Sequence, residues 1–154
     1  MNQTQIHASF ALECEQVFWR EYLNYAKLYI SAHDFLSYLR LRKTRIVLVT
    51  DLTTSIQLRK LAWLGLDKMF DLIITSEEAG GDKTTGCPED LLQTYLDPLP
   101  SKIWCLGDKE TDHLFQKDSQ FFKKVSTGPL RRTTHNCYEF SSYGDLLTQC
   151  KEQL

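Results

Sequence analysis

The stretch Arg45-Ile46-Val47-Leu48-Val49-Thr50-Asp51-Leu52-Thr53-Thr54 decides the fold of this chain. Its apolar run, residues 46–49, is typical of a strand buried on both faces of a parallel sheet. After a polar turn, residues 54–64 carry apolar side chains at helical spacing, and Gly65 follows where helices often end. In open α/β sheets, ligands bind at the carboxyl ends of such strands. The sequence therefore places the functional site near Thr50.

Further apolar runs downstream repeat this alternation of strand and helix. Because strands that alternate with helices form parallel sheets with helices on both faces, the pattern predicts a three-layer, Rossmann-like α/β fold. A proline at position 88, followed by two acidic residues, predicts a helix start. The expected strands cover 45–50, 69–76, 102–106 and 121–125; the expected helices cover 54–64, 88–95, 110–117 and 143–152; residues 77–83 are expected to form a polar turn and 127–137 an exposed loop.

The N-terminal part of the chain predicts a pair of helices. Residues 9–29 carry apolar and aromatic side chains at steps of three and four, which predicts a single apolar stripe on a long helix. We expect this stripe, which includes Phe10, Phe18 and Tyr22, to pack into the core rather than to bind a cofactor. Residues 33–43 predict the second helix, which ends in cationic side chains.

Composition excludes several classes of partner. The formal net charge of −2 gives no electrostatic basis for binding nucleic acid or an anionic membrane. No apolar run approaches the roughly 20 residues of a membrane span, and the first residues do not resemble a signal peptide. The five cysteines are scattered and form no C-x-x-C motif, which favours a reduced, cytoplasmic protein over a disulfide framework or a zinc site.

Polar side chains follow three of the expected strands. Thr50 ends the first, Lys83 follows the second, and Asp108 and Asp112 follow the third. A hydroxyl can donate a hydrogen bond to a phosphoryl oxygen, an ammonium can neutralise its charge, and carboxylates can bind Mg²⁺. Each residue alone has a structural explanation, such as a helix cap or a solvated surface charge. In this order at one sheet edge, they predict a phosphate site beside a hard cation.

These segments resemble the motifs of the haloacid dehalogenase superfamily, in its phosphatase-like branch. The run that ends at Thr50 resembles the second motif of that family, and Gly81-Asp82-Lys83 resembles the third. Residues 107–112, Gly-Asp-Lys-Glu-Thr-Asp, match the fourth, G-D-x-x-x-D. The resemblance, over roughly residues 28–150, implies phosphate binding by Thr50 and Lys83, Mg²⁺ binding by Asp108 and Asp112, and Mg²⁺-dependent hydrolysis of phosphomonoesters.

The first motif of that family, D-x-D-x-T/V, is absent, since the sequence contains no D-x-D. In the family this motif ends the central first strand and supplies the nucleophile and the general acid. The resemblance therefore implies one domain over 1–154, with residues 1–29 as the remnant of a cap helix and 30–154 as a Rossmann-like core that lacks its central strand. The affinity for Mg²⁺ is expected to be weak, because the first motif, which supplies the other Mg²⁺ ligands in the family, is missing.

Three functional hypotheses follow. The first is a fragment or split form of a phosphatase that is inactive as an isolated chain, with a substrate that this sequence does not specify. The second is a non-catalytic protein that uses the same fold to bind a partner or a phosphorylated ligand. In the third, Asp51 is the nucleophile, since Asp51-Leu52-Thr53 is similar to the D-K-T of cation-pumping ATPases.

Without a central strand, the strands that end at Thr50 and Leu106 would each present unpaired backbone groups, which are costly when buried. Three arrangements could satisfy them. The two strands could pair with each other, the N-terminal segment 4–10 could enter the gap, or a complementing chain or a second copy could donate a strand. We favour the donated strand, because residues 10–29 predict a helix that starts too early to leave room for a strand.

Overall fold

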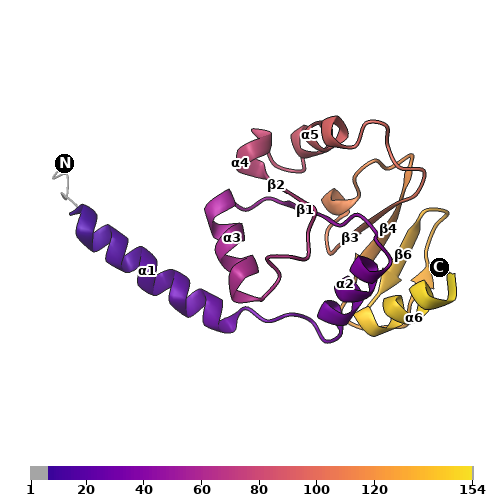
Figure 1. Ribbon diagram of the computed structural model, residues 1–154, viewed down its shortest axis with the longest axis horizontal. Coiled ribbons are helices and arrows are strands. Elements are labelled where there is room, and N and C mark those ends of the chain that lie inside the picture. The colour runs from indigo at the N-terminus through magenta and orange to yellow at the C-terminus, as the bar shows by residue number, and fades with distance from the viewer. Residues whose placement is uncertain (1–6, 154) are drawn as a thin grey trace.

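The computed structural model describes residues 7–153 of the chain (Figure 1). The elements alternate between helix and strand after an N-terminal helical pair, as expected. The helices are α1 (Ala8–Tyr25), α2 (Ala32–Leu41), α3 (Thr54–Trp63), α4 (Ser76–Ala79), α5 (Cys87–Tyr95) and α6 (Tyr143–Gln153), with a 3₁₀ turn η1 (Glu110–Asp112); the strands are β1 (Val47–Thr50), β2 (Leu72–Thr75), β3 (Ile103–Gly107), β4 (Ser119–Lys124), β5 (Arg131–Arg132) and β6 (Cys137–Phe140).

The strands form two separate sheets. In the first, β1 pairs with β2 in parallel, with Thr50 opposite Thr75. The second has the order β3-β4-β6-β5, and its first three strands are parallel. Within residues 7–153, β1 and β3 are not hydrogen-bonded to each other, so each is the edge of its sheet. The expected parallel α/β fold is confirmed, and the place of a central strand between β1 and β3 is open.

Two apolar clusters give the molecule its three layers. On one face, α2 and α6 pack against the second sheet through Phe35, Phe140 and Leu146, which are almost completely buried. On the other face, α5 and the segment around Leu114 pack against β1, β2 and β3. Successive residues of β3 alternate between these clusters, with Trp104 in the first and Cys105 in the second. Helices therefore cover both faces, as the alternating pattern predicted.

The apolar run 46–49 is less buried than expected. Only Ile46 is buried, whereas all residues of β1 and of β3 are half-buried. The prediction was of a strand buried on both faces; β1 pairs with β2 on one edge only, and its other edge borders a groove that leaves its side chains partly exposed. The two strands thus have helices above and below them but a groove along their facing edges.

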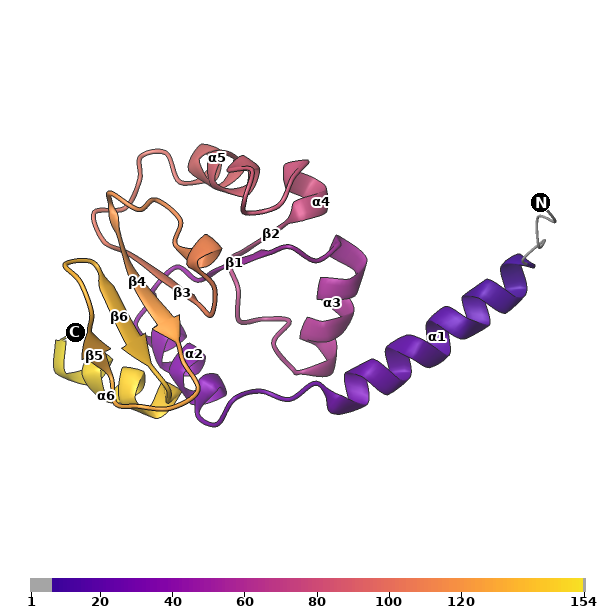
Figure 2. The same ribbon diagram turned by 180° about the vertical axis from the view of Figure 1, so that it is seen from behind.

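The expectation that the stripe of α1 packs into the core is wrong. α1 ends at Tyr25 rather than at residue 29 and contains no buried residue. It projects away from the rest of the molecule in both views (Figures 1 and 2), and Phe10 and Phe18 are 62% and 58% exposed. An ion pair of 3.3 Å joins its Glu15 to Arg59 of α3, and exposed pairs of this kind contribute little stability. Periodicity correctly predicted the helix but could not identify what the stripe would pack against.

Three smaller expectations also need correction. The helix expected over 110–117 is only the 3₁₀ turn η1: His113, with ψ of 82°, leaves the helical region, and Phe115 has a left-handed backbone with φ of 51°. The turn expected over 77–83 contains the short helix α4. The loop expected over 127–137 contains β5, which pairs antiparallel with β6.

No helix within residues 7–153 is both long enough and apolar enough to cross a membrane.

Candidate functional site

The loop after β1 is fastened to the segment after β2. The backbone N–H of Lys83 donates a hydrogen bond of 3.0 Å to Oδ1 of Asp51. The hydroxyl of Ser76 donates one of 3.0 Å to the backbone carbonyl of Asp51. These contacts bring Lys83, which lies 33 residues after Thr50 in the sequence, to the carboxyl end of β1. The predicted convergence of these two segments at one sheet edge is present in the structure.

Lys83 also links this edge to the second sheet. Its ammonium forms an ion pair with Oδ1 of Asp112, and the two side chains are only 12% and 10% exposed. The same nitrogen lies 4.0 Å from Oδ2 of Asp51, whose side chain is 40% exposed. Because Asp51 follows β1 and Asp112 follows β3, one ammonium group holds the carboxyl ends of both strands at the same edge.

Asp112 is held in place by backbone groups and by the close approach of a glycine. The backbone N–H groups of Asp108 and Lys109 each donate a hydrogen bond of 3.0 Å to its Oδ2. A Cβ at position 107 would lie 2.2 Å from the Cβ and from Oδ2 of Asp112, far closer than non-bonded atoms can approach. The glycine of the G-D-x-x-x-D pattern therefore provides the space in which Asp112 reaches Lys83.

The pKa of Asp112 lies below its ordinary value. Burial, the largest single effect, would raise this pKa, but the hydrogen bond from Lys83, the backbone N–H groups of Lys109 and Asp108 and the positive charge of Lys83 together outweigh it. These contacts favour the charged carboxylate in the folded state. Asp112 is thus a structural anion that neutralises Lys83.

This lowered pKa predicts part of the acid sensitivity of the protein. A carboxyl group whose pKa is lower in the folded than in the unfolded state contributes stability above its unfolded pKa, 3.8, and loses it as the pH falls through the folded value. We expect the free energy of unfolding, measured with urea, to decrease as the pH is lowered below about 4. This decrease should be smaller in the variant Asp112→Asn. An unchanged slope in that variant would show that Asp112 does not have the lowered pKa.

Thr50 lies at the end of β1, and its hydroxyl makes only long hydrogen bonds. Its Oγ1 donates a hydrogen bond of 3.3 Å to Oε1 of the buried Gln57 and accepts one of 3.3 Å from the backbone N–H of Leu52. Both bonds are at the long end of the usual range. A stronger acceptor at the strand end, such as a phosphoryl oxygen, could therefore replace Gln57 at little cost.

The two carboxylates expected to bind Mg²⁺ differ in their surroundings. Asp108 is exposed, whereas both oxygens of Asp112 already accept hydrogen bonds. Mg²⁺ requires six oxygen ligands in near-octahedral geometry. Residues 7–153 contain no group of three or more His, Cys, Asp or Glu side chains placed to hold a metal ion. These residues supply part of a magnesium site at most, and a complete one needs further oxygens.

Sequence reasoning missed a polar brace beside this site. The completely buried Thr75 accepts a hydrogen bond from the backbone N–H of Glu78, whose carboxylate reaches back to the N–H of Thr75. The hydroxyls of Thr75 and Thr54 are 2.8 Å apart. This reciprocal cap starts α4 and fixes the segment that leads to Lys83. The Thr-x-x-Glu spacing of residues 75–78 is the sequence signal that predicts such a cap.

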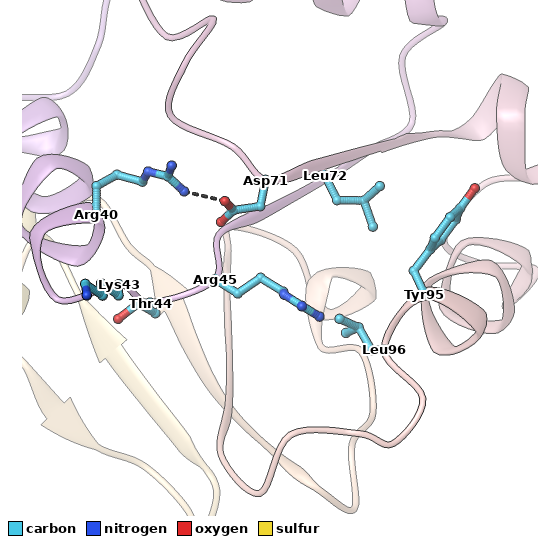
Figure 3. A pocket seen from close by; sticks show the side chains of 8 residues that line it. All are labelled: Arg40, Lys43, Thr44, Arg45, Asp71, Leu72, Tyr95 and Leu96. Carbon is cyan, nitrogen blue, oxygen red and sulfur yellow. Dashed lines mark hydrogen bonds and ion pairs between the residues drawn. The ribbon is translucent and has the colours of Figure 1, made fainter.

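A cavity of about 520 Å³ lies at the other ends of β1 and β2, away from Thr50 (Figure 3). Its main polar contact is an ion pair between Arg40 and Asp71. The second oxygen of Asp71 accepts a hydrogen bond of 2.8 Å from the backbone N–H of Ile46, and these contacts lower the pKa of Asp71. Asp71 thus joins the start of β1 to β2 and has a structural role remote from Thr50.

The fold and the site together define a class of protein. Parallel strands in two neighbouring sheets bring a threonine, a lysine and a G-D-x-x-x-D segment together at their carboxyl ends, and this is the fold of the haloacid dehalogenase-like phosphatases. Comparison with known proteins agrees. The chain is 37% identical over 98 residues to a ribulose-1,5-bisphosphate 5-phosphatase of Halopiger xanaduensis, a match that covers 64% of this chain and 41% of that protein.

Two solved structures have the same fold. A crystal structure assigned to a beta-phosphoglucomutase from Thermotoga maritima superposes with a TM-score of 0.74 at 17% identity, over 95% of this chain and 70% of the other. An HAD phosphatase from Thermococcus onnurineus gives 0.70 at 17% identity, over 88% and 64%. No protein family's sequence profile matches the chain. The resemblance found in the sequence is confirmed, and the chain spans about two-fifths of the curated relative that it matches.

Proposed function

We propose that this chain forms the phosphate-holding part of a haloacid dehalogenase-like phosphatase and that it does not turn over substrate by itself. The observation that carries the proposal is the position of the Lys83 ammonium, which Asp112 and Asp51 hold between the carboxyl ends of β1 and β3. Thr50 lies at the same edge. A single phosphoryl group at this edge could contact both side chains.

The chemistry of these two residues is electrostatic. An ammonium has three N–H donors; Asp112 accepts one, and Asp51, 4.0 Å away, is too distant for a short hydrogen bond. Lys83 therefore retains donors for a phosphoryl oxygen. The Thr50 hydroxyl would donate to a second oxygen in place of Gln57. Fixed donors directed at developing phosphoryl charge stabilise a transition state without further reorganisation.

The nucleophile is the part of the mechanism that Thr50 and Lys83 do not supply. Asp51 is the carboxylate beside the proposed phosphate position, but its Oδ1 accepts the backbone N–H of Lys83 and its side chain helps to join two loops. We therefore assign Asp51 a structural role and keep nucleophilic attack by Asp51 as the alternative. Mg²⁺, when bound, would neutralise phosphoryl charge, and Asp108 is the carboxylate available to contact it.

We expect the isolated chain to bind inorganic phosphate without hydrolysing phosphomonoesters. Phosphate should raise the thermal unfolding midpoint in proportion to the logarithm of its concentration. Thr50→Val or Lys83→Met should weaken its affinity by about tenfold or more, since each removes a charge-assisted hydrogen bond. Lys68→Met, at an exposed lysine that is well separated in sequence from Thr50, Lys83 and Asp112, is the matched control. Equal phosphate affinity in all variants would contradict the proposed site.

Turnover is tested in the same preparations. Substrates are p-nitrophenyl phosphate and sugar phosphates, the latter chosen because a matched relative is named for a phosphorylated sugar. With Mg²⁺ present, hydrolysis should stay at background. Hydrolysis that is lost in Asp51→Asn would favour Asp51 as the nucleophile, and hydrolysis that survives this substitution would place the nucleophile elsewhere.

A further inference from the structure

A groove of about 650 Å³ runs between the facing edges of β1 and β3. Every residue from Ile46 to Val49 lines one side, and 103–106 line the other. Neither strand has a hydrogen-bonded neighbour on this side among residues 7–153. Because each strand of a sheet can pair along both edges, the groove is bordered by two rows of backbone N–H and C=O groups that lack strand partners.

The groove has apolar surfaces on both faces of the sheet. Phe35 and Leu39 of α2 line it from one side. Leu92 of α5 and Leu96, just after the end of that helix, line it from the other. A segment that entered between β1 and β3 in an extended conformation would point alternate side chains at these two surfaces. Every residue of such a segment would therefore be apolar, as in strands buried on both faces.

The direction and length of such a segment follow from its neighbours. Lys83 contacts Asp51 after β1 and Asp112 after β3, so the two bordering strands run in the same direction. β1 has four residues and β3 has five, which sets the paired length at about five residues or 17 Å. The neighbouring pairings β1–β2, β3–β4 and β4–β6 are all parallel, which favours a parallel segment here as well.

The charged side chains along the groove are mainly cationic. Arg45 and Lys102 lie just before the two bordering strands, two residues before β1 and one before β3. Lys83 lies at the opposite end, and Lys27 and Lys60 also line the groove. Asp112 is the acidic residue that lines the groove, and it is paired with Lys83. An apolar segment with acidic residues at both ends would complement this distribution of charge.

The described part of this chain does not supply that segment. Its apolar runs already form β1, β2 and β3. Residues 7–10, the described part of the stretch 4–10 that could have entered the gap, form the N-cap and first residues of α1. Residues 1–6 lie outside the described structure, and their sequence, Met-Asn-Gln-Thr-Gln-Ile, contains no run of apolar residues and no carboxylate.

We propose that the groove between β1 and β3 binds an extended segment from outside residues 1–154, about five apolar residues flanked by acidic ones, as a parallel strand that joins the two sheets into one. Recognition combines backbone hydrogen bonds to both edges with burial of alternate side chains against α2 and α5. The proposal rests on the open edges, the apolar faces and the charges of the groove, and it is independent of phosphate binding at Thr50.

The test adds a synthetic peptide to the full chain. The probe is an acetylated and amidated peptide, Glu-Glu-Val-Ile-Val-Phe-Val-Asp-Asp. It should bind with one-to-one stoichiometry and raise the thermal unfolding midpoint with concentration. Amide hydrogen exchange should slow at least tenfold more in β1 and β3 than in β6, since only the first two strands gain partners. A central proline, which removes a backbone donor, should weaken binding at least tenfold.

Matched variants locate the bound peptide. Leu48→Glu places a carboxylate in the groove and should weaken binding at least tenfold, whereas Leu58→Glu, on the exposed side of α3, should leave it unchanged. Should Leu48→Glu fail to fold, the proline-containing peptide still decides the question. The proposal is overturned by unaltered exchange in β1 and β3 at millimolar peptide, by equal binding of the proline peptide, or by a self-associated chain whose β1 and β3 are already protected. Phosphate titration of the same samples reports separately on the site at Thr50.

Discussion

Replacement of Asp112 by asparagine should lower the free energy of unfolding by about 3 kcal/mol, as measured by urea denaturation at neutral pH. The substitution preserves an oxygen that can accept the N–H groups of Asp108 and Lys109 but removes the charge that neutralises Lys83. Removal of one partner from a buried ion pair costs roughly 3–5 kcal/mol. Because both side chains retain slight exposure, 12% and 10%, we expect the lower end of this range.

Asp108→Asn is the matched control for this experiment. Asp108 is exposed, and its replacement should change the free energy of unfolding by less than about 0.5 kcal/mol. A loss in Asp112→Asn as small as that in the control would mean that Lys83 finds a replacement partner. Asp51, 4.0 Å from the ammonium, is the nearest candidate. The double variant Asp51→Asn with Asp112→Asn would then lose far more stability than the two single variants together.

Replacement of Gly107 by alanine should cost about 3 kcal/mol or more. The new methyl group would lie 2.2 Å from the Cβ and from Oδ2 of Asp112, so either β3 or the 108–112 segment must move. Overpacking alone costs about 1–3 kcal/mol, and displacement of Asp112 from Lys83 adds to it. Urea denaturation measures the loss, and phosphate affinity should fall in parallel because Lys83 moves with its partner.

A double-mutant cycle separates this clash from any intrinsic effect of alanine in β3. In an Asp112→Gly background the atoms that meet the new methyl group are absent. Gly107→Ala should then cost less than about 1 kcal/mol, which gives a coupling energy of at least about 2 kcal/mol. Equal costs in the two backgrounds would refute the steric role of Gly107.

The sequence was sufficient to predict the elements that local patterns determine. The runs at 46–49 and 103–106 gave strands because uninterrupted apolar residues are unfavourable on a surface. The ordered set of Thr50, Lys83 and Asp112 predicted one sheet edge, since the carboxyl ends of parallel strands meet there. The contacts between Lys83, Asp51 and Asp112 agree with that expectation.

What the sequence could not predict depends on neighbours that a local pattern does not specify. The stripe of Phe10 and Phe18 has the same spacing whether or not another element covers it, so its exposure was not foreseeable. The half-burial of β1 is a similar case, because an apolar run indicates burial on both faces of a sheet without showing which elements cover them. The steric role of Gly107 is likewise a tertiary effect, in which a residue five positions later fills the space that a side chain would need.

The projection of α1 gives the molecule two regions of very different thermodynamic character. A helix of 18 residues with no buried side chain depends on its own hydrogen bonds and side-chain spacing, whereas most of the stability of helices in proteins comes from tertiary packing. The body around Phe140 and Leu146 instead opens only when its clusters separate. Loss of the helical conformation of α1 therefore leaves the body intact, and a protease that requires an unfolded substrate would cleave within residues 8–25 long before it reached the sheet.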